Sequence, residues 1–148
     1  MDDHVIHLLY SANRWEAKDE MERILNSGAH LIVDRYSFSG VAFSAAKDGM
    51  DYEWCRNPEV GLPEPDVVIF LELSIEDAKK RGDYGAERYE KEEFQRKVKA
   101  VYERLKDSKW VSVDAGRSMD EVQVDMKRIV DETINSISEG QTVGKLWQ

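Results

Sequence analysis

The sequence predicts an α/β fold in which helices flank a parallel sheet, and two observations support this class. Short apolar runs at residues 30–33, 67–73 and 110–114 have the length and composition of strands. Segments with apolar residues at helical spacing separate these runs, so helices and strands alternate as they do in α/β proteins. A length of 148 residues suits one domain with a substantial core, and we therefore expect a single domain over residues 1–148.

The first half of the chain is expected to form a helix, a strand and a second helix. Residues 4–12 and 15–27 carry apolar residues at helical spacing, and Gly28 follows as glycines do at helix ends. The run at residues 30–33 does not alternate with polar residues, which is typical of a strand buried on both faces of a parallel sheet. A helix is expected around residues 40–49, before a stiff glycine- and proline-containing segment that leads into the second strand.

The second half is expected to add three helices and a third strand. Ser74 to Asp77 matches a capping box and opens a short helix that ends near residues 81–82. Residues 90–107 carry one apolar stripe, formed by Phe94, Val98, Val101, Tyr102 and Leu105. After the strand at residues 110–114, Ser118 caps the last helix. Its core face comprises Val122, Met126, Ile129, Val130, Ile134 and Ile137.

Composition excludes several classes of partner and compartment. The net charge of −9 argues against a nucleic-acid or anionic-membrane surface, and no apolar run approaches membrane-spanning length. Cys55 is the only cysteine, so a disulfide framework is excluded and a reducing compartment is expected. The three histidines have no metal-ligand spacing, and the acidic start does not resemble a signal peptide. We therefore expect a cytoplasmic protein, with nuclear or mitochondrial residence left open.

The first strand is followed directly by Asp34 and Arg35, the residue types that handle phosphorylated ligands. Ligands of open α/β sheets bind at the carboxyl ends of the strands. There a carboxylate can hold Mg²⁺ through water, and an arginine can bind a phosphate with two parallel hydrogen bonds. Taken alone, the pair fits an ordinary surface ion pair equally well.

Arginines recur near the predicted strand ends and loops of this acidic chain, which favours a site for several phosphates. They are Arg14, Arg35, Arg81, Arg88 and Arg117. Residues 81–90 contain two glycines, two arginines and two tyrosines, and we predict that they form a lid over the phosphates, with a plain loop as the alternative. A Gly-x-x-x-x-Gly-Lys-Ser/Thr phosphate loop does not occur, and the nearest string, at residues 140–146, has the wrong spacing.

Several motifs together resemble the eukaryotic type of thymidylate kinase. The two most specific are Ser-Ala-Asn-Arg-Trp at residues 11–15 and Asp-Arg-Tyr-x-Phe-Ser-Gly at residues 34–40. Residues 61–66, 81–82, 87–90, 113–115 and 144–147 also match, so the similarity covers nearly the whole chain. The resemblance implies a P-loop-kinase-type sheet and the phosphorylation of dTMP to dTDP with ATP and Mg²⁺, a step of dTTP biosynthesis.

The resemblance also implies roles for individual residues. Tyr10 stands at the position of the aromatic residue, phenylalanine in other members, that stacks on thymine in this family. Arg14 stands at the position of the arginine that contacts a thymine carbonyl. The dTMP-binding set is Tyr10, Arg14, Arg35, Ser39, Gly40, Phe43 and Tyr89. Asp34, Arg35 and Arg88 are implied as catalytic, with Asp34 also beside Mg²⁺ through water. Arg81, Arg88 and Arg117 are implied to bind ATP.

The chain departs from the family pattern at its start. Family members begin with a strand, a phosphate loop and a helix, followed by a second strand, so we expect the sheet to lack its first two strands and to retain three. We accordingly expect residues 1–148 alone to fold poorly and not to transfer a phosphoryl group. The alternative is a non-catalytic short form that binds dTMP or pairs with a full-length subunit, since the family forms homodimers through helices that include residues 4–25. A deoxynucleoside kinase is a more distant alternative.

Overall fold

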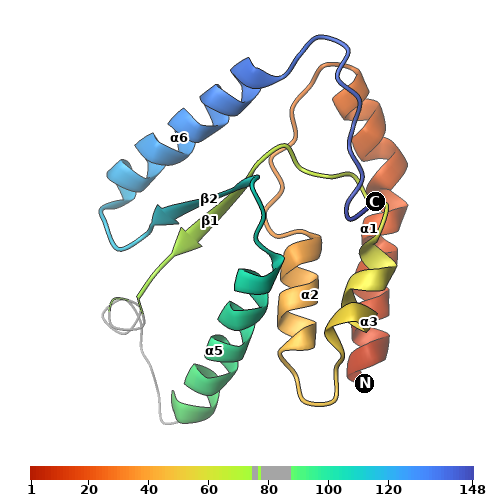
Figure 1. Cartoon of the computed structure of the whole chain (residues 1–148), viewed down its shortest axis with the longest axis vertical. Helices are drawn as coiled ribbons and strands as arrows, with labels where there is room; N and C mark the ends of the chain where they lie inside the picture. Colours follow the sequence, from red (N-terminus) through yellow and green to blue (C-terminus); the bar gives the residue numbers. More distant parts are fainter. Residues whose placement is uncertain (75–76, 78–87) are drawn as a thin grey trace. The chain divides into compact units, whose positions relative to one another are not determined.

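The computed structural model describes residues 1–74, 77 and 88–148, which group into two compact units. The first unit comprises residues 1–64, 90–105 and 142–148, and the second comprises residues 65–89 and 106–141. Figure 1 gives the order of the elements along the chain. Most of the predicted lid at residues 81–90 lies outside the described residues, and the single domain and the lid stay predictions.

The first unit is helical. Its longest element is α1 (Asp3–Asn26), which the Asp2 side chain caps by accepting from the His4 backbone N–H at 2.8 Å. Gly28, at φ +86°, follows the end of the helix, as the sequence predicted. Helix α2 (Ser37–Ala45) packs against α1, and α3 (Tyr52–Arg56) packs against α2. The short 3₁₀ helix η1 (Asn57–Glu59) follows α3 and contacts α1. Helix α5 (Arg88–Leu105) contributes its residues 90–105 to this unit.

The core of the first unit includes a segment from the far end of the chain. Val41, Cys55 and Leu62 have no exposed surface, and Leu146 is 1% exposed. The Leu146 N–H donates to the Leu62 carbonyl at 2.8 Å, and the Leu146 carbonyl accepts from Gly61 at 3.0 Å. Leu146 therefore belongs to this core, and its two backbone hydrogen bonds hold the segment that follows η1.

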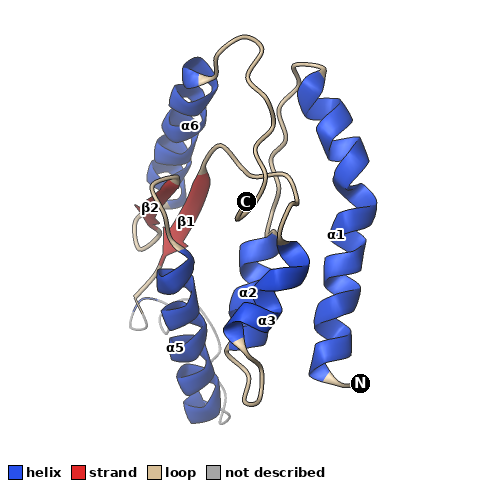
Figure 2. Ribbon diagram, turned by 45° about the vertical axis from the view of Figure 1, so that its right-hand side comes forward, coloured by secondary structure: helices blue, strands red, loops and turns tan. Residues whose placement is uncertain are grey.

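The second unit contains the sheet. Strands β1 (Val68–Glu72) and β2 (Trp110–Asp114) pair in parallel, with Val68 opposite Trp110 and Glu72 opposite Asp114. Helix α6 (Met119–Ser136) contacts β2, and Figure 2 shows this helix beside the two strands. Ser118 caps this helix, as the sequence predicted, and together with Glu121 it forms a complete capping box. The α/β class with a parallel sheet and flanking helices is confirmed.

The prediction of a strand at residues 30–33 is wrong. This segment follows α1 as loop, with Ile32 88% and Val33 49% exposed. A strand exists only as a member of a hydrogen-bonded ladder, and no described residue supplies the ladder partner for this segment. The described sheet therefore has two strands. None of the described helices is long and apolar enough to cross a membrane.

Candidate functional site

A buried ion pair between Arg14 and Glu59 lies at the centre of the candidate site, in the first unit. Arg14 is on α1 and Glu59 ends η1. The Arg14 Nε donates to Glu59 Oε2 at 2.7 Å, and its Nη2 donates to Oε1. The Glu59 side chain has no exposed surface, whereas that of Arg14 retains 15%. Because a buried carboxylate is costly unless it is paired, this fork fixes the guanidinium strongly.

Helix α1 also fixes the backbone that carries Glu59. The Pro58 carbonyl accepts from Ser11 Oγ at 3.1 Å and from the Trp15 indole N–H at 2.6 Å. Ser11, Arg14 and Trp15 lie on the same face of α1, since residues three and four apart are neighbours on a helix. The motif at residues 11–15 therefore has a structural function, which is to hold η1 and its carboxylate in place.

Gly40, on α2, lies directly against the Arg14 guanidinium. A Cβ atom at this position would be 2.7 Å from Arg14 Nη2 and 3.3 Å from both Cζ and Nη1. The helix and the guanidinium can approach this closely only because glycine has no side chain. The structure thus brings together two residues that the resemblance assigned to the same pocket.

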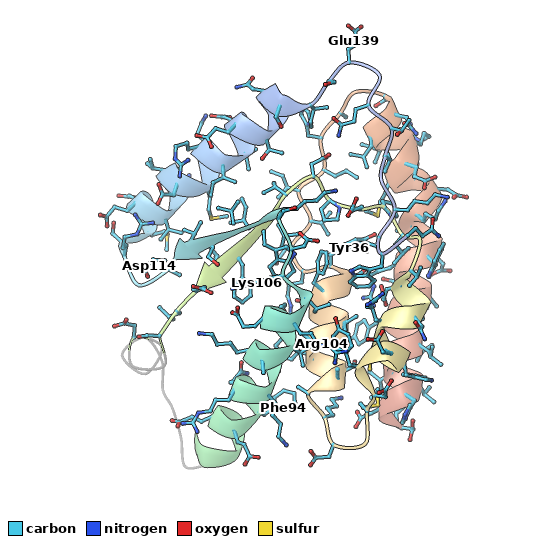
Figure 3. All side chains as sticks on the ribbon, viewed as in Figure 1. Tyr36, Phe94, Arg104, Lys106, Asp114 and Glu139 are labelled. Atoms are coloured by element: carbon cyan, nitrogen blue, oxygen red, sulfur yellow. The ribbon has the colours of Figure 1, made fainter. Side chains whose placement is uncertain are left out.

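Two hydroxyl groups at the start of α2 are buried near this pair. The Tyr36 hydroxyl (Figure 3) and the Ser37 hydroxyl have no hydrogen-bond partner among the described residues. Burial, with a further contribution from the negative charge of Glu59, raises the pKa of Tyr36 to about 12. Tyr36 therefore remains a neutral phenol at physiological pH.

A second cluster forms around Arg35, whose backbone is left-handed at φ +63°. This conformation is uncommon outside glycine and is often found at functional sites. The Arg35 guanidinium lies over the Phe43 ring, with Cζ 4.8 Å from its centroid, and its Nε is 3.4 Å from Ser39 Oγ. Ser39 Oγ in turn hydrogen-bonds the Tyr102 hydroxyl at 2.7 Å. Three of the predicted site residues thus meet here.

Tyr10 and Asp34, two further predicted site residues, are exposed. Tyr10, 64% exposed, precedes Arg14 by one helical turn on α1, so both lie on one face. Asp34 is exposed, and within the described part of the chain it has no hydrogen-bond or ion-pair partner. A free carboxylate beside an arginine fits Mg²⁺, which commonly binds proteins through one or two carboxylates, waters and substrate phosphates.

The remaining predicted residues belong to the second unit. Arg117 forms an ion pair with Asp125, and its Nε donates to the Asp114 carbonyl at 3.3 Å. The hydrogen bond from Arg117 lowers the pKa of Asp125. Arg88 and Tyr89 are in the first turn of α5, but their side chains, like Arg81 as a whole, lie outside the described residues.

Sequence reasoning missed two residues that the geometry connects to the site. Glu59 had no distinguishing motif, and only its buried pairing with Arg14, 45 positions away, reveals it. The sequence placed Tyr102 in the apolar stripe of a helix, and this agrees with its position on α5. That pattern did not predict the hydrogen bond between its hydroxyl and Ser39. A phenol on the apolar face of a helix is the signal that could have suggested this bond, because buried tyrosines usually have a polar partner.

Comparison with known proteins gives consistent matches to one family. A family model described as thymidylate kinase matches residues 1–126. The chain is 52% identical over 138 residues to the thymidylate kinase of Dictyostelium discoideum, covering 93% of this chain and 62% of the relative. It is 51% identical over 147 residues to that of Arabidopsis thaliana, covering 99% of this chain and 56% of the relative. The chain therefore spans less than two thirds of the length of these two relatives.

A human relative and a solved structure agree with these matches. The human thymidylate kinase is 44% identical over 151 residues, which cover 100% of this chain and 71% of the relative. The solved structure of thymidylate kinase from Candida albicans superposes with a TM-score of 0.82 at 33% identity, covering 98% of this chain and 73% of that one.

Proposed function

Because this chain belongs to the thymidylate kinase family, we propose that the protein transfers the γ-phosphoryl group of ATP to dTMP, which yields dTDP and ADP. The observation that carries this proposal is the arrangement of two arginines in the first unit. Arg14 is held by a buried carboxylate and closely covered by Gly40, while Arg35 lies over Phe43 beside Ser39. Two fixed guanidinium groups suit a ligand that has both a base and a phosphate.

We assign the acceptor side of the reaction to the first unit. Tyr10 stacks on the thymine ring, and Arg14 donates to a thymine carbonyl. Arg35 binds the dTMP phosphate, where its planar group can donate two parallel hydrogen bonds. Ser39, Gly40 and Phe43 line the base and sugar pocket. Tyr89, from the predicted lid and outside this unit, is assigned to dTMP binding as well. The contacts of Gly40 with Arg14 and of Phe43 with Arg35 support this assignment.

We assign the donor side to one carboxylate and three arginines. Asp34 holds Mg²⁺ through water, and Arg81, Arg88 and Arg117 bind ATP, with Arg88 also stabilising the transferred group. When bound, Mg²⁺ neutralises negative charge on the phosphates. Residues 1–148 contain no Gly-x-x-x-x-Gly-Lys-Ser/Thr motif. We therefore expect phosphoryl transfer to require a phosphate loop in addition to the residues named here.

We further propose that the protein acts in the cytoplasm as a homodimer. Apolar side chains on α1, including Val5, Leu8 and Leu9, are between 46% and 57% exposed, and a second copy would cover them.

The test uses the native protein, meaning the polypeptide that carries residues 1–148 at the length at which the cell makes it. We expect ADP formation that depends on dTMP, ATP and Mg²⁺ and that thymidine does not support. Arg35→Ala should lower kcat/KM for dTMP by about ten- to a hundredfold, the value of a charge-assisted hydrogen bond. Arg23→Ala, which alters an exposed arginine of α1, serves as the control and should not change it.

Two results of this test would contradict the proposal. Phosphorylation of thymidine in preference to dTMP would indicate a deoxynucleoside kinase. Binding of dTMP without turnover, by a native protein whose intact mass is 17.1 kDa, would indicate a non-catalytic form.

A further inference from the structure

We propose that Glu59 is a positioning residue for base recognition. It orients the Arg14 guanidinium so that the edge between Nη1 and Nη2, with its two N–H donors, faces the base. It thereby favours a base that presents a carbonyl at this place over one that presents an amino group. This inference rests on the proposed function, because it concerns how the same pocket selects its nucleotide. Glu59 itself, with no exposed surface, acts through Arg14 and does not touch the ligand.

The guanidinium geometry determines which donors remain available. Glu59 accepts from Nε and Nη2, which lie on one side edge of the planar group. One N–H of Nη2 and both N–H groups of Nη1 are left, and they have no hydrogen-bond partner among the described residues. The end edge between Nη1 and Nη2 therefore carries two parallel donors. A carbonyl oxygen of the base can accept a hydrogen bond at this edge. An amino group of the base would place its own N–H donors against those of Arg14, which is unfavourable.

Arg14 has little freedom to leave this orientation. If it rotated away, Glu59 would remain as an unpaired, fully buried carboxylate, which is strongly unfavourable. On the other side, Gly40 is so close that a single added methyl group would overlap Nη2. The bonds from Ser11 and Trp15 to the Pro58 carbonyl keep the carboxylate itself from moving. Orientation by a second residue is what gives a flexible arginine a fixed direction.

Glu59→Gln is the informative substitution, because it preserves the shape of the side chain. Its amide can accept one hydrogen bond from Arg14, but its NH₂ group meets the second donor, so the fork is lost. We expect KM for dTMP to rise about tenfold, with a smaller change in kcat. The preference for dTMP over dCMP, measured as a ratio of kcat/KM values in the native protein, should fall by about the same factor.

A second variant separates positioning from a general loss of structure. Arg14→Met/Glu59→Gln removes both partners and leaves no unpaired buried charge. If Glu59 acts only through Arg14, this double variant and an Arg14→Met variant should have the same reduced dTMP/dCMP ratio. Val98→Ala, which creates a cavity in buried α5 surface, is the stability control and should leave the ratio unchanged.

The outcomes distinguish this inference from the proposed function. If the unmodified protein prefers dTMP and Glu59→Gln retains the full preference, Glu59 does not position Arg14 and the inference is overturned. A further drop in the ratio when Glu59→Gln is added to Arg14→Met would also overturn it, since Glu59 would then act by another route. An unmodified protein that neither phosphorylates nor binds dTMP would contradict the proposed function, and this inference with it.

Discussion

Replacing Gly40 by alanine should destabilise the first unit, although the same change stabilises most helices. Gly40 lies inside α2 and has no positive φ, so alanine fits its backbone conformation. In an exposed helix this substitution would gain about 0.5–1 kcal/mol. Here the new Cβ would be 2.7 Å from Arg14 Nη2, about 0.7 Å closer than the 3.4 Å at which ordinary van der Waals contact begins.

The cost follows from what Arg14 would have to give up. A shift of about 0.7 Å is comparable to the difference between the 2.7 Å bond from Nε to Glu59 and a contact near the 3.5 Å hydrogen-bond limit. A hydrogen bond to a charged group contributes about 1.5–3 kcal/mol, and a broken buried ion pair costs about 3–5 kcal/mol. After the gain in helix propensity, we expect a net loss of about 1–3 kcal/mol in the free energy of unfolding.

Urea unfolding of the native protein measures this change as a shift in midpoint at constant m-value. The matched background is Arg14→Met/Glu59→Leu, in which no guanidinium opposes the new methyl group. There Gly40→Ala should stabilise by about 0.5–1 kcal/mol, so the sign should reverse between the two backgrounds. Stabilisation by Gly40→Ala in the unmodified protein would refute the reasoning, because the contact with Arg14 would then have no energetic weight.

Two further predictions concern contacts around the same unit. His7 is 1% exposed, its Nε2 donates to the Cys55 carbonyl at 2.8 Å, and Ser44 Oγ donates to its Nδ1 at 2.8 Å. Burial lowers the pKa of His7, so over a range of pH below its ordinary pKa the unfolded chain binds a proton that the folded chain does not. The free energy of unfolding should therefore be at its full value above about pH 6.5. Below that pH it should fall by at most about 1.4 kcal/mol per pH unit. Urea titrations should show this slope removed by His7→Gln and retained in His4→Gln, whereas an unchanged slope in His7→Gln would assign the titration to other groups. Tyr102→Phe should lower the free energy of unfolding by about 1 kcal/mol, because it removes the hydrogen bond to Ser39. If the same loss is measured in a Ser39→Ala background, this hydrogen bond is not the cause of the loss.

Local sequence signals predicted the helices and strands that depend on local chemistry. Gly28 ends the first helix, and Ser118 with Glu121 caps the last one, because caps act over three or four residues. The strand at residues 110–114 was predicted with its observed bounds. The strand expected at residues 30–33 failed, since its formation depends on a ladder partner elsewhere, which β-propensity cannot specify.

The candidate site was predictable only as far as its motifs reach. The resemblance supplied Arg14, Arg35 and Gly40, and the structure adds that Gly40 lies against Arg14. Glu59 and Tyr102 could not be predicted as members, because their significance arises from contacts across 45 and 63 residues. Side chains that position a functional residue usually have no sequence motif of their own. In the structure they are identified as the partners of buried charged groups.

The two arginines of the first unit meet opposite electrostatic requirements, and this difference supports their separate roles. Arg14 is neutralised by a buried carboxylate, so it can lie mostly buried and offers direction without net charge, which suits a neutral base. Arg35 is exposed and, within the described residues, has no carboxylate partner, so its full charge is available to a phosphate. In a chain of net charge −9, an uncompensated cation held over an aromatic ring is the more favourable site for a dianion. Exchanging the two environments would therefore weaken both contacts, because a neutralised arginine attracts phosphate poorly and an unpaired one cannot be kept buried beside a base.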